Sequence, residues 1–130
     1  MLYGNIKKGF GCGTMSNANW MTQMKKGLLE LCVLSLLDRE SLYGYQIVRR
    51  LTEFPGLVIT EGTVYPLLSR LREEGLVSST FSESPTGPVR RNYVLTAAGR
   101  RELQSMGEAW GELSEAVSSL MSRQKEPHKK

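Results

Sequence analysis

The chain has 130 residues, which suffices for one domain and leaves little room for a second hydrophobic core. Hydrophobic residues make up 40% and charged residues 23%, as in an ordinary folded globular protein. Lysine and arginine number 17 against 13 acidic residues, and the net charge of +4 permits an anionic partner without establishing one. Because the basic residues are spread along the chain, a nucleic-acid interpretation must rest on the positions of particular arginines and lysines.

The side chains that carry most enzyme chemistry are scarce. The single histidine, His128, lies in a polar tail, and the two cysteines, Cys12 and Cys32, cannot complete a four-ligand zinc site with it. The longest apolar stretch ends at Asp38 and is too short to span a membrane. Both cysteines are predicted to be free thiols of a cytoplasmic protein. An enzyme is therefore disfavoured, and no metal or cofactor is expected.

The first nineteen residues contain four glycines and no continuous apolar run, so residues 1–19 are predicted to be a flexible arm. One hypothesis is that Met15 is the natural start and that residues 1–14 precede it as an extension. From Trp20 to Leu37 apolar residues recur at helical spacing, which predicts the first helix. This helix becomes apolar nearly all round after its first half, which indicates burial on several sides.

A second helix is predicted from Tyr43 to about Phe54, after a short polar turn. Its inner face is predicted to consist of Ile47, Val48, Leu51 and Phe54. The Pro-Gly pair that follows Phe54 cannot continue a helix and therefore ends it.

A third helix is predicted to follow Thr60, a residue suited to capping a helix N-terminus, and to end at about Glu74, just before Gly75. Pro66 is unusual at this place, because proline is comfortable only in the first turn of a helix. Either the helix is kinked at Pro66 or it begins near Thr63. The sequence leaves both alternatives open.

The segment from Leu76 to Leu95 is predicted to form a two-stranded hairpin. Apolar and polar residues alternate after Leu76, turn-forming residues occupy 82–88, and a second strand returns over 92–95. A two-stranded hairpin is only marginally stable by itself, so this one is expected to lie against the helices.

Thr96 is predicted to cap a last helix that runs to about Ser122, followed by a flexible basic tail over residues 123–130. Six apolar residues at alternating steps of three and four form a narrow stripe, which we call the seam: Leu103, Met106, Trp110, Leu113, Val117 and Leu120. Such a stripe favours a partner helix, here a second copy of the chain, over packing against its own domain.

This order of elements predicts a mostly α (α+β) fold: a winged helix-turn-helix domain over residues 20–95 with a two-stranded β wing, then a dimerisation helix over residues 96–122. In such a fold the third helix enters the DNA major groove, and the arginines after the hairpin turn meet phosphates or a minor groove. The expected DNA contacts are Lys26, Tyr43, Thr60, Gly62, Thr63, Tyr65, Pro66, Ser69, Arg70, Arg90 and Arg91. The alternative is that these residues are only the solvated faces of ordinary elements.

Trp110 suggests a ligand site, because a tryptophan on a paired helix offers a flat apolar surface for planar molecules. The hypothesised site consists of Trp110, Met106, Trp20 and Met24, and its ligand would be a small aromatic effector. The alternative is that Trp110 is a packing anchor without any ligand.

Several motifs resemble those of the PadR family of bacterial transcriptional regulators, over about residues 20–122. They are Lys26-Gly27-Leu28-Leu29-Glu30, Tyr43-Gly44-Tyr45-Gln46-Ile47, Glu61-Gly62-Thr63-Val64-Tyr65-Pro66-Leu67-Leu68 and Arg90-Arg91-Asn92-Tyr93-Val94-Leu95-Thr96. The resemblance implies a homodimeric repressor that binds a palindromic operator and dimerises through its C-terminal helices. It also implies kinship with multidrug-responsive members that have one C-terminal helix, in which a tryptophan similar in position to Trp110 lines a pocket between subunits.

The predicted function is therefore sequence-specific DNA binding by a homodimeric repressor, with release by a small planar aromatic effector as a further hypothesis. The competing interpretation is a helical protein–protein adaptor that uses the seam on a different protein and binds no DNA. Salt dependence separates the two, because DNA binding weakens steeply with salt and an apolar contact does not.

Overall fold

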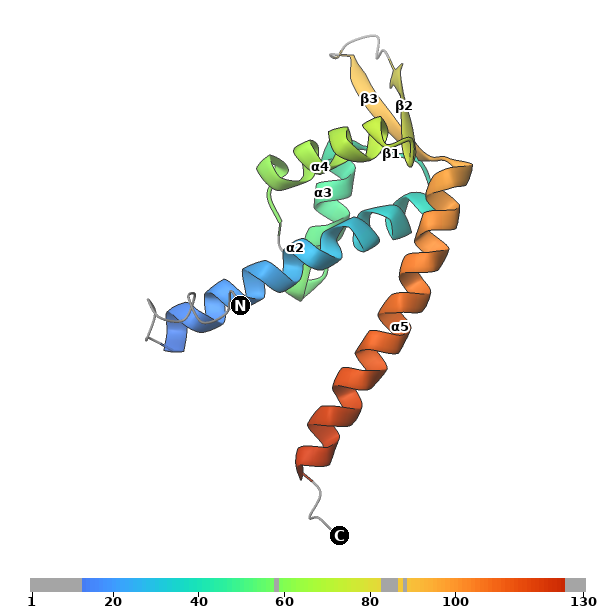
Figure 1. The fold of residues 1–130 in the computed structure, drawn as a ribbon. Helices are drawn as coiled ribbons and strands as arrows, with labels where there is room; N and C mark the ends of the chain where they lie inside the picture. Colours follow the sequence, from blue (N-terminus) through green and yellow to red (C-terminus); the bar gives the residue numbers. More distant parts are fainter. Residues whose placement is uncertain (1–12, 58, 83–86, 88, 126–130) are drawn as a thin grey trace.

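The computed structural model describes residues 13–57, 59–82, 87 and 89–125. In chain order the elements are α2 (Gly13–Arg39), β1 (Leu42–Tyr43), α3 (Gly44–Thr52), the 3-10 turn η1 (Pro55–Leu57), α4 (Glu61–Glu73), β2 (Val77–Ser82), β3 (Arg90–Leu95) and α5 (Ala97–Lys125). Figure 1 shows α3, α4 and the strands gathered on one side of α2, while the long α5 runs away from them. The predicted winged helix-turn-helix fold with a long C-terminal helix is confirmed.

The structure differs from the predicted flexible arm over residues 13–19, which belong to α2. After Gly13 the chain has no glycine or proline until Gly27, so nothing interrupts a helix in this stretch. Residues 1–12, and with them the rest of the predicted arm, lie outside the described residues. The predicted tail differs as well, because residues 123–125 continue α5, and residues 126–130 are outside the described part.

The sheet has three strands instead of the two that the hairpin predicted, in the order β1-β3-β2. The wing, as we call the β2–β3 hairpin, is antiparallel, and it places Val77 opposite Leu95. The short β1 pairs with β3 through Leu42 opposite Tyr93 and Tyr43 opposite Asn92. Two residues between a polar turn and a helix are too few to show an alternating pattern, which is why the sequence did not reveal β1.

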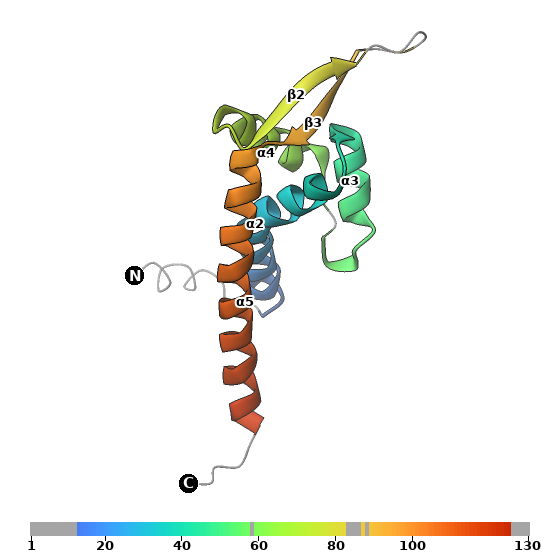
Figure 2. The same ribbon diagram turned by 90° about the vertical axis from the view of Figure 1, so that its right-hand side faces the viewer.

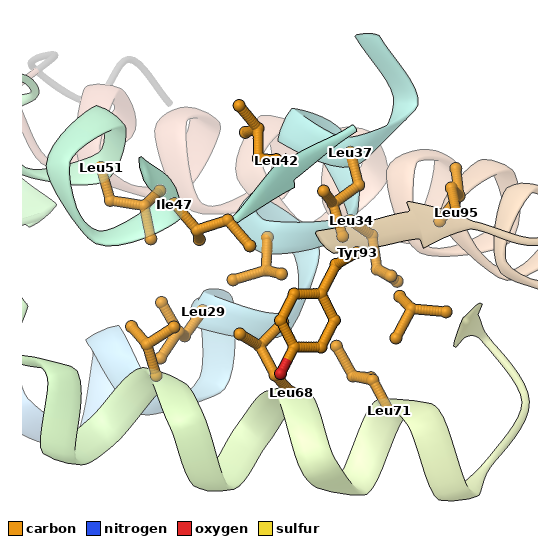
Figure 3. Packing of buried hydrophobic residues seen from close by; sticks show 13 residues of the cluster. Leu29, Leu34, Leu37, Leu42, Ile47, Leu51, Leu68, Leu71, Tyr93 and Leu95 are labelled. Carbon is orange, nitrogen blue, oxygen red and sulfur yellow. The ribbon is translucent and has the colours of Figure 1, made fainter. Parts of the chain in front are cut away.

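The hydrophobic core joins α2, α3, α4 and the inner face of the sheet in one cluster (Figure 3). Its fully buried members with no exposed surface are Val33, Leu34, Ile47, Val64, Leu68 and Leu71. Each side chain of this size contributes roughly 1.5–3 kcal/mol when it is removed from water. Figure 3 shows the Tyr93 ring reaching from β3 toward α4 beside Leu68, so the sheet closes the core over α4.

Helix α4 begins at Glu61 after the N-cap Thr60, so it does not begin near Thr63. Pro66 lies inside the helix. Because proline has no N–H, the carbonyl of Gly62 lacks the intrahelical hydrogen bond that residue 66 would normally donate. This carbonyl belongs to an exposed residue, where water or another polar group can reach it.

The end of α4 and the start of α5 are joined through the backbone of Leu76. Gly75 adopts a positive φ of 79°, and the Leu76 N–H donates to the Leu71 carbonyl at 2.9 Å, which closes α4. The Leu76 carbonyl in turn accepts from the Thr96 N–H at 3.1 Å and from the Thr96 hydroxyl at 3.0 Å. The Thr96 Oγ1 also caps α5 by accepting from the Gly99 N–H at 2.9 Å, as the sequence predicted.

The seam on α5 is partly buried at its beginning and exposed over the rest of its length. Leu103 and Met106 pack against the core, where α5 contacts α2. The other four members remain exposed: Trp110 at 42%, Leu113 at 59%, Val117 at 45% and Leu120 at 60%. Figure 2 shows this half of α5 running beyond the rest of the molecule. Packing within the domain therefore explains the first two residues of the seam, and Trp110 lies at the edge of the domain, where it lines a groove with α2, α3 and η1. Leu113, Val117 and Leu120 remain largely exposed in a single chain.

Candidate nucleic-acid interface

One face of α4 carries most of the residues that the sequence predicted to meet DNA. Its buried side is held in the core by Val64, Leu68 and Leu71. The opposite side is exposed and consists of Gly62, Thr63, Tyr65, Pro66, Ser69 and Arg70, with Thr60 at the N-cap. The Thr60 and Thr63 hydroxyl oxygens lie 3.4 Å apart at the start of the helix. Small and hydroxyl-bearing residues there allow close approach to DNA, and the free backbone N–H groups of a first turn favour phosphate.

Tyr65 connects this face to the start of α3. Its ring lies against Gly44 so closely that a Cβ atom on Gly44 would overlap the ring. Burial, followed by the charge of Glu61 and the neighbouring Tyr93, raises the pKa of the Tyr65 hydroxyl. The hydroxyl therefore stays protonated at neutral pH and can donate a hydrogen bond to an anionic group. Gly44 is required here because no other residue leaves room for the ring.

Arg70, another predicted DNA contact, is paired within the protein. Its guanidinium lies 2.9 Å from a Glu30 carboxylate oxygen on α2 and 3.0 Å from one of Glu74 on α4. These hydrogen bonds, first that of Glu30 and then that of Glu74, raise the pKa of Arg70. A DNA contact by Arg70 would have to replace at least one of the two pairs. Lys26 is exposed on α2 and does not line the cleft formed by α4, the start of α3 and the wing.

The two wing arginines lie next to each other on β3 and therefore point to opposite faces of the sheet. The Arg90 guanidinium lies 5.0 Å from the centroid of the Tyr45 ring. The Arg91 guanidinium lies 4.5 Å from the centroid of the Phe81 ring and donates to the Ser79 hydroxyl oxygen at 3.0 Å. Within the described residues neither arginine forms an ion pair with a carboxylate, so both keep their charge for an outside partner.

A cleft of about 380 Å³ lies where α4, the start of α3 and the wing meet. Among the described residues its lining contains arginine, tyrosine and glycine and no acidic residue: Tyr43, Gly44, Tyr45, Tyr65, Arg90, Arg91 and Tyr93. The structure thus brings Tyr43, Tyr65 and both wing arginines together, as the predicted interface requires. Sequence reasoning assigned no role to Tyr45, although it belongs to the Tyr-Gly-Tyr motif. The ring of Tyr45 is distant in sequence from Arg90, and only the fold shows their contact.

A second, mostly apolar groove of about 630 Å³ lies between α2, α3, η1 and α5. Trp110 lines it together with residues such as Cys32, Phe54 and Leu103. The other three residues of the hypothesised ligand site, Met106, Trp20 and Met24, do not line this groove. Burial raises the pKa of the free Cys32 thiol, which keeps it protonated and less nucleophilic at neutral pH.

The described part of the chain contains neither a metal-binding cluster nor a membrane-spanning helix. No three histidine, cysteine, aspartate or glutamate side chains there are grouped so that they could hold a metal ion. No helix in the same part is both long and apolar enough to cross a membrane.

Three packed helices, a wing that carries two arginines and an exposed helix face beside it define a winged helix-turn-helix protein. The sequence profile described as the transcriptional regulator PadR-like family matches residues 33–105, more than half of the chain. The chain belongs to the PadR-like family of transcriptional regulators, whose members are DNA-binding regulators and not enzymes. This membership favours DNA binding over the adaptor alternative.

Solved structures agree with this assignment. A PadR-like transcription factor from Bacteroides fragilis is 41% identical, with 78% of this chain and 98% of that chain covered and a TM-score of 0.67. A PadR-like transcriptional regulator from Bacillus cereus is 36% identical, and the match covers 76% of this chain and 96% of that chain with a TM-score of 0.69. Bacillus subtilis PadR, solved in complex with operator DNA, is 28% identical, and the match covers 61% of this chain and 45% of that chain with a TM-score of 0.57.

Proposed function

We propose that the protein is a repressor that binds a palindromic operator as a homodimer and blocks transcription by occupying the DNA. The observation that carries this proposal is the exposed face of α4 beside two wing arginines that have no carboxylate partner in the described chain. The similarity to Bacillus subtilis PadR, whose structure holds operator DNA, supports the same use of these surfaces. In a dimer the two copies of α4 would lie about 34 Å apart, one turn of the duplex.

The homodimer in this proposal is formed by the exposed part of the seam. Trp110, Leu113, Val117 and Leu120 follow one another along α5 and are each more than two-fifths exposed in the single chain. Apolar residues at heptad spacing on a helix that extends beyond its own domain are typical of two paired helices. A two-fold axis between two such helices would give a symmetric arrangement that matches a palindromic site.

The double variant Arg90→Ala and Arg91→Ala tests the DNA-binding part of the proposal. Removing two phosphate-contacting cations is expected to weaken binding to a duplex selected from a random pool by about tenfold or more at moderate salt. The slope of log K against log salt is expected to become shallower by about two, because fewer counterions are released. Fluorescence anisotropy at several salt concentrations measures both quantities.

A matched control removes a different pair of adjacent arginines, Arg100 and Arg101 at the start of α5. Both are exposed, and Arg100 is paired with Asp38 at 3.4 Å, so their removal changes the net charge equally without touching the wing. The control variant is expected to bind within about twofold of the wild type, since surface ion pairs contribute little. Equal losses in the two variants would mean that only net charge matters and would contradict the proposed interface.

We further propose that a planar aromatic molecule regulates the repressor by binding beside Trp110. The groove next to Trp110 supports this, since its lining is mostly apolar and about 630 Å³ is enough space for a small ligand. Such a molecule would release DNA only if it bound the DNA-incompetent arrangement more tightly than the competent one.

The variant Trp20→Phe makes Trp110 the single tryptophan and allows a direct test. Titration with a panel of planar aromatic compounds is expected to quench Trp110 fluorescence with saturation, and to lower DNA affinity in parallel. Trp110→Leu should abolish the effect on DNA affinity while leaving binding without the compound within about twofold, since leucine keeps both the groove and the seam apolar. Linear, unsaturable quenching by every compound would show that Trp110 only packs.

A further inference from the structure

The outer half of the wing extends past the short strand β1. Strand β1 pairs only with Asn92 and Tyr93 of β3, whereas β2 continues alongside β3 to the pair of Ser82 and Arg90. The outer part therefore has only two strands, an arrangement that is marginally stable in water. An arginine on such a hairpin loses much conformational freedom when it binds a phosphate, and this loss weakens the contact unless the side chain is already held.

Two tyrosines at the start of α3, Tyr43 and Tyr45, contact this outer half of the wing. The Arg90 guanidinium lies 5.0 Å from the centroid of the Tyr45 ring. Tyr45 in turn stacks on Tyr43, with ring centroids 6.1 Å apart and planes at 8°. The Tyr43 hydroxyl lies 3.1 Å from the Ser82 hydroxyl on the other wing strand, at hydrogen-bonding distance. The two tyrosines thus contact both strands of the wing beyond the end of β1.

Tyr43 and Tyr45 lie at the start of α3, which packs against α4, the helix that carries the proposed DNA-reading face. The Tyr43 N–H donates to the Gln46 side-chain oxygen at 2.8 Å, which closes the first turn of α3. Gly44, between the two tyrosines, packs directly under the ring of Tyr65 from α4. The start of α3 therefore links α4 on one side with Arg90 on the other.

We propose that Tyr45 is a positioning residue that holds the Arg90 guanidinium in the orientation in which it meets the DNA backbone. This inference rests on the proposed function, because the orientation of Arg90 matters only if the wing contacts DNA. The ring supplies the interaction, since a guanidinium over an aromatic face is attracted to it and keeps its outer N–H donors free. The hydroxyl of Tyr45 is not needed for this role.

A double-mutant cycle between Tyr45 and Arg90 tests the proposal, with DNA affinity measured on a duplex selected by the wild-type protein. Tyr45→Leu is expected to weaken binding about two- to fivefold, and Tyr45→Phe is expected to change it by less than about twofold. In the Arg90→Ala background, Tyr45→Leu should cause no further loss, because the side chain that it positions is gone. Additive losses, or an equal loss in Tyr45→Phe, would overturn the proposal and indicate that the Tyr45 hydroxyl contacts DNA itself.

Arg91 provides the matched control within the same wing. Arg91 lines the same cleft, but its guanidinium is held by the Phe81 ring and the Ser79 hydroxyl and not by Tyr45, so Tyr45→Leu combined with Arg91→Ala should give losses that add. A general weakening of the wing by Tyr45→Leu would instead couple to both arginines equally. Coupling to Arg91 as strong as that to Arg90 would therefore overturn the positioning role.

A measurement on the free protein separates this proposal from the proposed function. The side-chain protons of Arg90 next to the Tyr45 ring should show upfield ring-current shifts in the NMR spectrum, retained in Tyr45→Phe and lost in Tyr45→Leu. Absence of these shifts in the wild type would overturn the positioning contact even if DNA binds. Failure of the wild type to bind any duplex, with the shifts present, would overturn the proposed function and with it the role of the contact in DNA binding.

Discussion

The double variant Leu113→Glu and Leu120→Glu is expected to be monomeric and to bind a full operator on the order of 100-fold more weakly than the wild type. Both leucines are about three-fifths exposed in the single chain, at 59% and 60%, so glutamate there costs the monomer little. In a paired helix the same positions would face their counterparts, and the two-fold axis would bring four carboxylates into an apolar contact. The monomer would retain one reading helix and lose the gain from binding two half-sites together.

The matched control is Ser118→Glu with Ser119→Glu, which adds the same charge to exposed positions of α5 outside the seam. It should remain a dimer by analytical ultracentrifugation and should bind the operator within a few-fold of the wild type, since added surface charge acts mainly through screened repulsion. A dimeric Leu113→Glu and Leu120→Glu variant would place the interface elsewhere. A wild type that sediments as a monomer at micromolar concentration would remove the homodimer from the proposal altogether.

The elements that the sequence predicted well are those whose evidence is local. The six seam residues repeat at helical spacing. Gly75 and Thr96 occupy helix ends where a positive φ or a capping hydroxyl is needed, and Thr60 is the N-cap residue of α4 although its side chain makes no capping hydrogen bond. These signals need no knowledge of what lies opposite. The short strand β1 has no such signal, because its two residues become a strand only when β3 lies beside them.

The candidate site shows the same division. The exposed face of α4 followed from helical spacing, and the wing arginines followed from their place after the turn. The pairing of Arg70 with Glu30 joins residues forty positions apart, and the contact of Arg90 with Tyr45 joins a strand to a distant helix. The local sequence predicts neither contact, because the sequence around an arginine does not show whether its partner is a carboxylate, an aromatic ring or DNA.

Gly99→Ala is expected to lower the free energy of unfolding by about 1–3 kcal/mol, although alanine normally stabilises a helix relative to glycine by about 1 kcal/mol. A Cβ atom at Gly99 would overlap the Leu76 carbonyl oxygen and lie 2.7 Å from a methyl carbon of Leu95. The carbonyl cannot move aside freely, because it accepts from both the N–H and the hydroxyl of Thr96. The substitution must therefore separate the start of α5 from the end of α4 or strain both.

Gly111→Ala is the control for this prediction, because Gly111 lies on the same helix and a Cβ atom there would meet nothing within 4 Å. It should raise the stability by up to about 1 kcal/mol through helix propensity alone. Urea denaturation at one fixed protein concentration compares the two variants, because the stability of a dimer depends on concentration. Opposite signs would show that the contact with Leu76 outweighs propensity at Gly99. If both variants were stabilised equally, the close packing between Gly99 and Leu76 could not be what ties α5 to the winged domain.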